Sequence, residues 1–86
     1  MPVVELSVRA QDFLDKLDKD ISERIKSRLR NLENNPVPSD SKFIGREDNE
    51  MIFRYRIGNF RVLYKVKKSM NIILVAKIDK RERVYD

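Results

Sequence analysis

Three arginines flank the dipeptide Gly58-Asn59, and their spacing predicts that their guanidinium groups lie close together, where they could bind or stabilise negative charge. The stretch Glu50 to Lys67 reads EMIFRYRIGNFRVLYKVK, in which two strand-like runs enclose a two-residue loop with Gly at its first position. Such a loop is a common hairpin turn. In this hairpin Arg56 faces Arg61, and Arg54 lies two residues further along the same strand face. Guanidinium groups bind phosphate oxygens bidentately, so the cluster predicts a site for an anionic ligand.

A purely structural reading of these arginines stays open beside that hypothesis. They could be solvated charges on an outer face, with their aliphatic stems covering apolar surface. However, like charges that face each other across a strand pair destabilise it, by about 0.2–1 kcal/mol on the scale of such pairs. We therefore favour an arginine cluster retained for an anionic ligand.

The residue types that are missing exclude several kinds of site. The chain contains no histidine and no cysteine, which removes the usual general base, the usual zinc ligands, disulfides and the common nucleophile arrangements. We expect no metal and no cofactor. No apolar run approaches the roughly 18–20 residues of a membrane span, and no signal peptide is recognisable. A cytoplasmic protein that does not contact a membrane is expected.

Positive charge is concentrated in the second half of the chain. Residues 1–40 contain seven Lys or Arg and eight Asp or Glu, a net charge of −1, whereas residues 41–86 contain twelve and six, a net charge of +6. This asymmetry favours a polyanionic partner on that side, nucleic acid first and an acidic protein second. The length of 86 residues allows one small domain, residues 1–86.

The first half of the chain predicts one short strand and two helices. Residues 3–7 alternate as a strand, and Ser7 can cap a helix over about residues 8–17. A break near residues 18–20 precedes a second helix, for which Asp18 and Asp20 are equally good caps. The second helix carries the apolar stripe Ile21, Ile25, Leu29 and Leu32. Its opposite face, with Arg24, Lys26, Arg28 and Arg30, is interpreted mainly as a solvated surface.

The second half predicts a sheet. Residues 34–40 form a loop because Pro36 cannot continue the helix. Residues 42–45 add a short strand or a turn, the hairpin follows, and the apolar run of residues 72–76 indicates a central strand buried on both faces. The order β-α-α-β-β-β predicts an α+β domain, with two N-terminal helices packed on one face of a mainly antiparallel sheet. The apolar hairpin face must receive the helices, so the arginine face is expected to be uncovered.

These segments resemble the RelE/ParE superfamily of toxin–antitoxin toxins. The hairpin FRYRIGNFRVLY is similar to the family's R-x-R-x-G-x-Y-R-x-x-Y motif, KFIG at residues 42–45 to its K-x-L-x-G entry to the sheet, and KRERVY at residues 80–85 to its C-terminal motif. The likeness is to the RelE branch, whose members cut messenger RNA in the ribosomal A site and are neutralised by an antitoxin, RelB.

The resemblance implies roles for individual residues. Arg61 would hold the scissile phosphate, Arg81 would act at the leaving 5′-oxygen or on the phosphate, and Tyr85 would stack on a base or orient the attacking 2′-hydroxyl. Arg54 stands where the family has one of two important lysines. Further contacts to RNA or the ribosome are expected from Lys42, Arg56, Lys65, Lys80 and Arg83.

One departure from the family concerns proton transfer. Ile52 stands where the family has its other important lysine, and the guanidinium of Arg54 is a poor general base because it stays protonated. A lysine at position 65, 77 or 80 could substitute only if the fold brings it to the 2′-hydroxyl. The arginines expected to stabilise negative charge are therefore present, whereas the residues expected to transfer protons are largely missing.

The resemblance thus implies a metal-independent, ribosome-dependent endoribonuclease that acts as the toxin of a type II system. Two alternatives stay open: an inhibitor of DNA gyrase resembling the ParE branch, and an inactivated toxin kept as an RNA-binding or co-repressor module. The expected partners are an acidic RelB-like antitoxin, in a heterodimer or heterotetramer, and the ribosome with its mRNA. Operator DNA would be bound only through the antitoxin.

Overall fold

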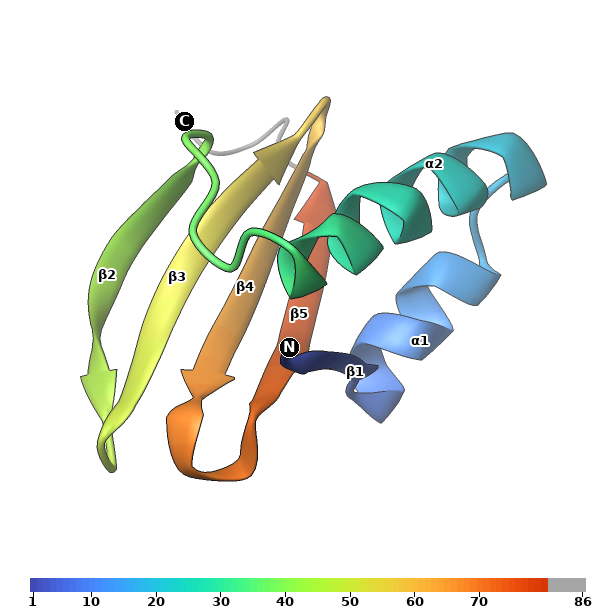
Figure 1. Ribbon diagram of the computed structural model, residues 1–86. Coiled ribbons are helices and arrows are strands. Elements are labelled where there is room, and N and C mark those ends of the chain that lie inside the picture. Colours follow the sequence, from blue (N-terminus) through green and yellow to red (C-terminus); the bar gives the residue numbers. More distant parts are fainter. Residues whose placement is uncertain (81–86) are drawn as a thin grey trace.

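The computed structural model describes residues 1–80 and consists of two helices on one face of a five-stranded sheet (Figure 1). This confirms the predicted α+β class and the packing of both helices on one side. The elements are, in order, β1 (Val3–Leu6), α1 (Val8–Asp15), α2 (Lys19–Arg30), β2 (Ser41–Glu47), β3 (Glu50–Ile57), β4 (Phe60–Lys67) and β5 (Ile72–Lys80). Short 3-10 turns follow α2 at Asn31–Glu33 and β4 at Lys68–Met70.

The strand order in the sheet is β1-β5-β4-β3-β2. Strand β1 runs parallel to β5, and every other neighbouring pair is antiparallel. The segment that the sequence left as a short strand or a turn is a full edge strand, β2, with a bulge between Phe43 and Gly45. The sheet therefore has one strand more than the predicted order.

The register of the central hairpin is the one that a two-residue turn at Gly58-Asn59 predicts. Arg56 faces Arg61, Tyr55 faces Val62 and Phe53 faces Tyr64. Gly58 adopts a φ of 56°, a left-handed angle that glycine reaches without a steric penalty and that the first position of this turn requires. The turn thus fixes which side chains share a face.

One face of the hairpin builds the core. Its buried side chains include Tyr64 and Val62, both 0% exposed, and Phe53 and Tyr55, both 4% exposed. Phe53 stacks on Tyr64 with ring centroids 5.4 Å apart. The helices close this layer with buried apolar side chains: Ala10, Leu14, Ile25 and Leu29. No helix formed by residues 1–80 lies on the opposite face of the sheet (Figure 1).

The helix ends follow the predicted caps in part. The Ser7 hydroxyl accepts a hydrogen bond from the Ala10 N–H at 3.0 Å and donates one to the Ala76 carbonyl at 2.8 Å, which ties α1 to β5. Asp18 occupies the N-cap position of α2 without a side-chain cap bond. No helix among the described residues combines the length and the apolar character that crossing a membrane requires.

Strand β5 corrects one prediction. It is an interior strand, as expected, but only one of its faces is fully buried, with Ile73 and Val75 both 0% exposed. The alternate residues Ile72 and Leu74 are half-buried because the helices cover only one side of the sheet. The continuous apolar run therefore correctly predicted an interior strand. The prediction that both faces of this strand are fully buried was wrong.

A buried tyrosine positions the loop between α2 and β2. The Tyr64 hydroxyl donates a hydrogen bond of 2.6 Å to the Pro36 carbonyl. Further along the loop, the N–H and the hydroxyl of Ser41 both bond the Pro38 carbonyl, at 2.9 and 2.7 Å. These bonds fix the direction in which the chain enters β2, and with it the places of Asp40 and Lys42.

The hairpin turn can be tested with paired glycine variants. A Cβ atom would meet no heavy atom within 4 Å at Gly58 or at Gly45, but only Gly58 has a positive φ. We expect Gly58→Ala to lower the free energy of unfolding by about 1–2 kcal/mol, the cost of a left-handed angle for a residue with a Cβ. Gly45→Ala should change it far less. Equal urea midpoints for the two variants would contradict this role of the turn.

The loop anchor can be tested with Tyr64→Phe. Loss of the hydrogen bond to Pro36 should lower the free energy of unfolding at neutral pH by about 1 kcal/mol or more. Burial also raises the pKa of Tyr64 above its ordinary value. Unfolded tyrosine ionises near pH 10, so the parent protein should lose stability above about pH 10 and the variant should lack this loss. Parallel urea titrations at neutral and alkaline pH measure both effects; a gap that stays constant with pH would contradict the second.

Candidate functional site

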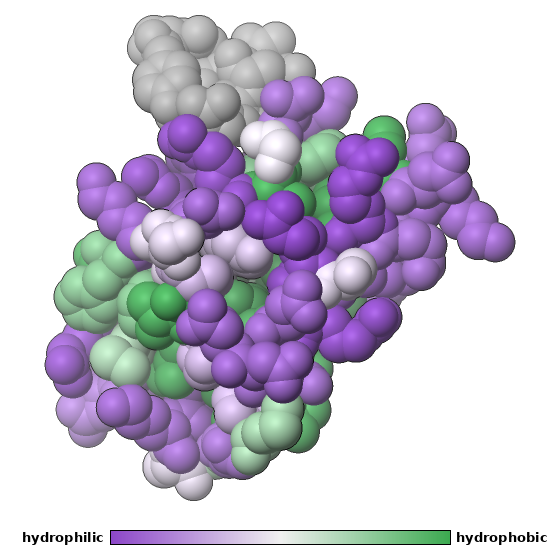
Figure 2. All heavy atoms as spheres, turned by 45° about the horizontal axis from the view of Figure 1, so that its top comes forward, coloured by the Kyte–Doolittle hydropathy of each residue, from purple (hydrophilic) through white to green (hydrophobic). Residues whose placement is uncertain are grey.

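A pocket of about 630 Å³ opens at the end of the sheet where the central hairpin turns. Strand β2 begins at Ser41 opposite Tyr55, so the last residues of β3 extend past it. The pocket lies along this unpaired edge and reaches from the uncovered sheet face to α2. It is lined by Arg28, Asp40, Lys42, Arg54, Arg56, Gly58 and Arg61. Hydrophilic side chains cover most of this end of the molecule (Figure 2).

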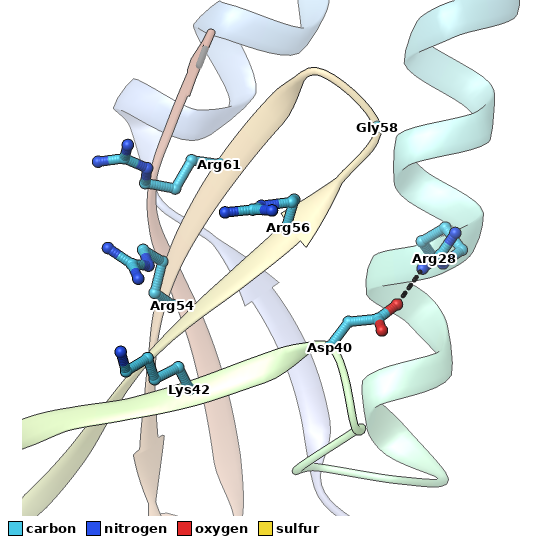
Figure 3. A pocket seen from close by; sticks show the side chains of 7 residues that line it. All are labelled: Arg28, Asp40, Lys42, Arg54, Arg56, Gly58 and Arg61. Carbon is cyan, nitrogen blue, oxygen red and sulfur yellow. Dashed lines mark hydrogen bonds and ion pairs between the residues drawn. The ribbon is translucent and has the colours of Figure 1, made fainter. Parts of the chain in front are cut away.

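Strand pairing brings four of these cations together. Lys42 of β2 pairs with Arg54 of β3, and Arg56 of β3 pairs with Arg61 of β4. Figure 3 shows the side chains of Lys42, Arg54 and Arg61 extending to the same side of three neighbouring strands. The predicted arginine cluster is therefore present on the face without helices, and Lys42 extends it onto the edge strand.

The charges of the pocket are poorly balanced. Among residues 1–80, five positive side chains line it together with one carboxylate, that of Asp40, which bonds Arg28 at 3.2 Å. Within residues 1–80, Lys42, Arg54 and Arg61 take part in no ion pair and no side-chain hydrogen bond with another residue. The strand neighbour of Arg61 is Asp79, whose carboxylate instead bonds Lys77 at 3.2 Å. Such a concentration of positive charge costs stability and favours binding of an anion.

The opposite end of the same sheet face is electrically balanced. Lys65 bonds Glu47 at 2.8 Å, and Lys67 lies 3.6 Å from Glu50. The hydrogen bond between Lys65 and Glu47 raises the pKa of the lysine and lowers the pKa of the glutamate. One sheet face thus carries a neutralised end and a cationic end, and only the cationic end forms the pocket.

The predicted site residues separate into three groups. Arg54, Arg56, Arg61 and Lys42 come together in the pocket. Lys65 lies at the neutralised end, and Lys80, which pairs with Phe60, lies at the end of β5 outside the pocket lining. Arg81, Arg83 and Tyr85 fall outside the described residues.

Two residues of the pocket were missed from sequence. Arg28 was assigned to the solvated face of α2, and Asp40 was given no role. Arg28 lies next to the buried stripe formed by Ile25 and Leu29, and from there its Nε donates a hydrogen bond of 3.2 Å to the Tyr55 hydroxyl. The only signal in the sequence is that Arg28 stands at the border of the apolar stripe.

The donor set of the pocket suits an anion and does not suit a metal ion. Lysine and arginine offer only hydrogen-bond donors, which match phosphate or carboxylate oxygens. Among the described residues, no group of three or more histidine, cysteine, aspartate or glutamate side chains is arranged to hold a metal. The arrangement can bind a phosphate group and stabilise negative charge that develops on it.

Comparisons with known proteins identify the family. The family model of the ParE toxin of the type II toxin–antitoxin system parDE matches residues 4–85. A relative from Methanocaldococcus jannaschii, named RelE1 as a candidate toxin, is 34% identical over 83 residues, which cover 95% of this chain and 92% of that protein. The archaeal RelE–RelB complex from Pyrococcus horikoshii contains a chain that superposes with a TM-score of 0.85 at 26% identity, covering 95% of this chain and 97% of that one.

Bacterial structures share the fold at lower identity. The isolated RelE toxin of Escherichia coli superposes with a TM-score of 0.75 at 20% identity, covering 93% of this chain and 84% of that one. A chain of the RelBE2 complex of Mycobacterium tuberculosis gives 0.76 at 23%, covering 94% of this chain and all of that one. The chain therefore belongs to the RelE/ParE superfamily of type II toxin–antitoxin toxins and resembles its RelE branch.

Proposed function

We propose that this toxin inhibits translation by cleaving messenger RNA in the ribosomal A site, without a metal ion. The observation that carries the proposal is the group of cations on the uncovered end of the sheet, where Arg54, Arg61 and Lys42 have no ion-pair partner among residues 1–80. RNA brings its own nucleophile, the 2′-hydroxyl, so a pocket without histidine or cysteine can still support the reaction.

The reaction requires charge stabilisation above all. The 2′-oxygen attacks the phosphorus, the bond to the 5′-oxygen breaks, and the 5′ fragment is left with a 2′,3′-cyclic phosphate. We assign Arg61 to the scissile phosphate, with Arg54 and Arg56 beside it. A single preorganised donor of this kind is worth about a hundred- to thousandfold in rate. Arg81 and Tyr85, assigned by resemblance to the leaving oxygen and to a base or the 2′-hydroxyl, complete the proposed set.

The position of the lysines suggests where protons go. Lys65 forms a short ion pair with Glu47 at the far end of the face, and Lys77 pairs with Asp79. Lys42 is the lysine that lines the pocket, beside Arg54. An amine gives up a proton far more readily than a guanidinium. We therefore assign proton exchange with the reacting oxygens to Lys42, in place of the lysines that the family has at positions 52 and 54.

Dependence on the ribosome follows from this division of labour. The pocket supplies charge and little acid–base help, and acid–base help is usually worth about 10²–10⁴ in rate. A binding partner that holds the RNA in line for attack can compensate for the missing acid–base catalysis, because positioning of the reacting groups alone increases the rate by large factors. We propose that the ribosome with its mRNA is this partner.

The ParE-like alternative has two specific observations in its favour. The matching family model describes ParE toxins, and Ile52 replaces a lysine that the nuclease branch uses. In that case the protein would inhibit DNA gyrase and leave mRNA intact. An inactivated toxin retained as an RNA-binding or co-repressor module would neither cleave mRNA nor inhibit DNA gyrase.

We also propose an acidic RelB-like antitoxin as the partner. Chains of similar fold from Pyrococcus horikoshii and Mycobacterium tuberculosis occur in complexes with antitoxins. A helix of the partner would bring carboxylates to the cationic end of the sheet and neutralise its positive charge. Contact with operator DNA would then pass through the antitoxin.

Arg61→Ala tests the assignment of the phosphate site. The variant should fold normally because Arg61 lies on the uncovered face, and mRNA cleavage on translating ribosomes should fall by about a hundred- to thousandfold. Arg46→Ala is the matched control, since Arg46 is an exposed strand arginine that faces Met51 and lies outside the pocket lining. Equal cleavage and equal growth inhibition by Arg61→Ala and the parent protein would refute the assignment.

Charge reversal tests the proposed partner. The toxin should co-purify as a complex with an acidic RelB-like antitoxin when the two proteins are co-expressed. Arg54→Glu combined with Arg61→Glu should weaken that complex at least about tenfold, because opposed charges at an interface are replaced by like charges. Arg46→Glu serves as the control, and affinity is measured by calorimetry. A complex insensitive to the double reversal would place the antitoxin elsewhere on the molecule.

A further inference from the structure

Arg28 reaches the cationic pocket from a different layer of the fold. The other four cations stand on strands, whereas Arg28 stands on α2. The pocket passes over the edge of the hairpin next to Gly58, where β3 extends beyond β2. It thereby connects the face of the sheet with the surface of α2. Figure 3 shows the strand cations on one side of this edge and Arg28 with Asp40 on the other.

The guanidinium of Arg28 is held in place by the core. The Nε of Arg28 donates a hydrogen bond to the Tyr55 hydroxyl at 3.2 Å, and the Cζ atom of Arg28 lies 5.7 Å from the centre of the Tyr55 ring. Tyr55 itself is 4% exposed, so its neighbours hold the ring. The hydrogen bond to Tyr55 raises the pKa of Arg28. An arginine fixed in this way loses little entropy when it binds an anion.

Asp40 occupies the anion-binding edge of that guanidinium. Its carboxylate accepts a hydrogen bond from Nη2 of Arg28 at 3.2 Å. The side chains of Arg28 and Asp40 are 43% and 58% exposed, so this is a surface ion pair of the kind that contributes little to stability. A carboxylate and a phosphate present the same acceptor geometry to a guanidinium, and a phosphate can therefore replace Asp40 at small cost.

We infer that Arg28 binds an RNA phosphate next to the scissile one, and that Asp40 is an internal substitute for this phosphate which weakens RNA binding until it is displaced. This inference rests on the proposed function, since it extends the same pocket. The RNA strand would run from Arg61 and Arg54 on the sheet face, across the edge of the hairpin, to α2. Arg28 thus acts in binding and positioning and not in the chemical step.

The test measures binding without cleavage. A fluorescent single-stranded RNA that is 2′-O-methylated throughout cannot be cut through its 2′-hydroxyl, and its affinity is read by anisotropy over a series of salt concentrations. Arg28→Gln should weaken binding about tenfold, the effect of one hydrogen bond to a charged group. The slope of log affinity against log salt should fall by about 0.7, the value for one phosphate contact of a single strand.

Matched variants separate a local contact from a general loss of charge. Arg30→Gln removes the same charge from the same helix, but Arg30 lines a different pocket, beside Val4 and Leu6, and should have a much smaller effect. Asp40→Asn should tighten binding by up to about fivefold, the effect of one unit charge at close range in water. Asp12→Asn, a change at an exposed position of α1, should not.

The variants distinguish failure of this inference from failure of the proposed function. If Arg61→Ala weakens RNA binding while Arg28→Gln resembles Arg30→Gln, the inference is wrong and the proposed function stands. If Arg61→Ala also leaves binding unchanged, the pocket does not bind RNA and both are wrong. If Asp40→Asn only lowers the urea midpoint and leaves affinity unchanged, the ion pair merely fastens the loop to α2 and the inference is wrong. Should Arg28→Gln fail to fold, Arg28→Lys and Asp40→Asn decide between the same outcomes.

Discussion

Electrostatic repulsion within one small surface is the constraint that the rest of the structure has to accommodate. The pairing of Arg56 with Arg61, and of Arg54 with Lys42, places like charges on neighbouring strands of one face. The fold holds them there by stabilising the other face of the same strands, where Tyr55, Val62 and Tyr64 are buried. Because side chains alternate along a strand, the apolar core determines the position of every arginine opposite it.

The distribution of carboxylates shows where this repulsion is tolerated. At one end of the face Glu47 and Glu50 neutralise Lys65 and Lys67. At the other end Asp79 bonds Lys77, although its strand neighbour is Arg61. Within residues 1–80, these carboxylates on the strands thus pair with lysines outside the pocket and leave Lys42, Arg54 and Arg61 without an ion pair. A surface that gives up stability in this way is suited to an external polyanion, and in a RelE/ParE superfamily toxin the proposed polyanion is RNA, with an acidic antitoxin as its competitor.

Most of the fold could be predicted from local patterns, because those patterns have local causes. The turn at Gly58, the cap at Ser7 and the end of α2 before Pro36 are each determined by a few residues. The hairpin register then followed from the turn alone. The edge strand β2 was left open because its exposed, bulged sequence carries little hydrophobic pattern. For the site, the strand cations were predicted, but Arg28 and Asp40 were not. Their contact depends on how α2 and the following loop pack against Tyr55, which no sequence spacing reveals.

The proposed role of the cationic pocket is to direct the 2′-hydroxyl of mRNA against its own phosphate. The most direct measurement determines the ends of mRNA after the purified toxin has acted on translating ribosomes. We expect cuts in phase with codons, with a 2′,3′-cyclic phosphate on each 5′ fragment. Intact mRNA together with inhibited gyrase, or fragments that end in a 3′-hydroxyl, would contradict this role.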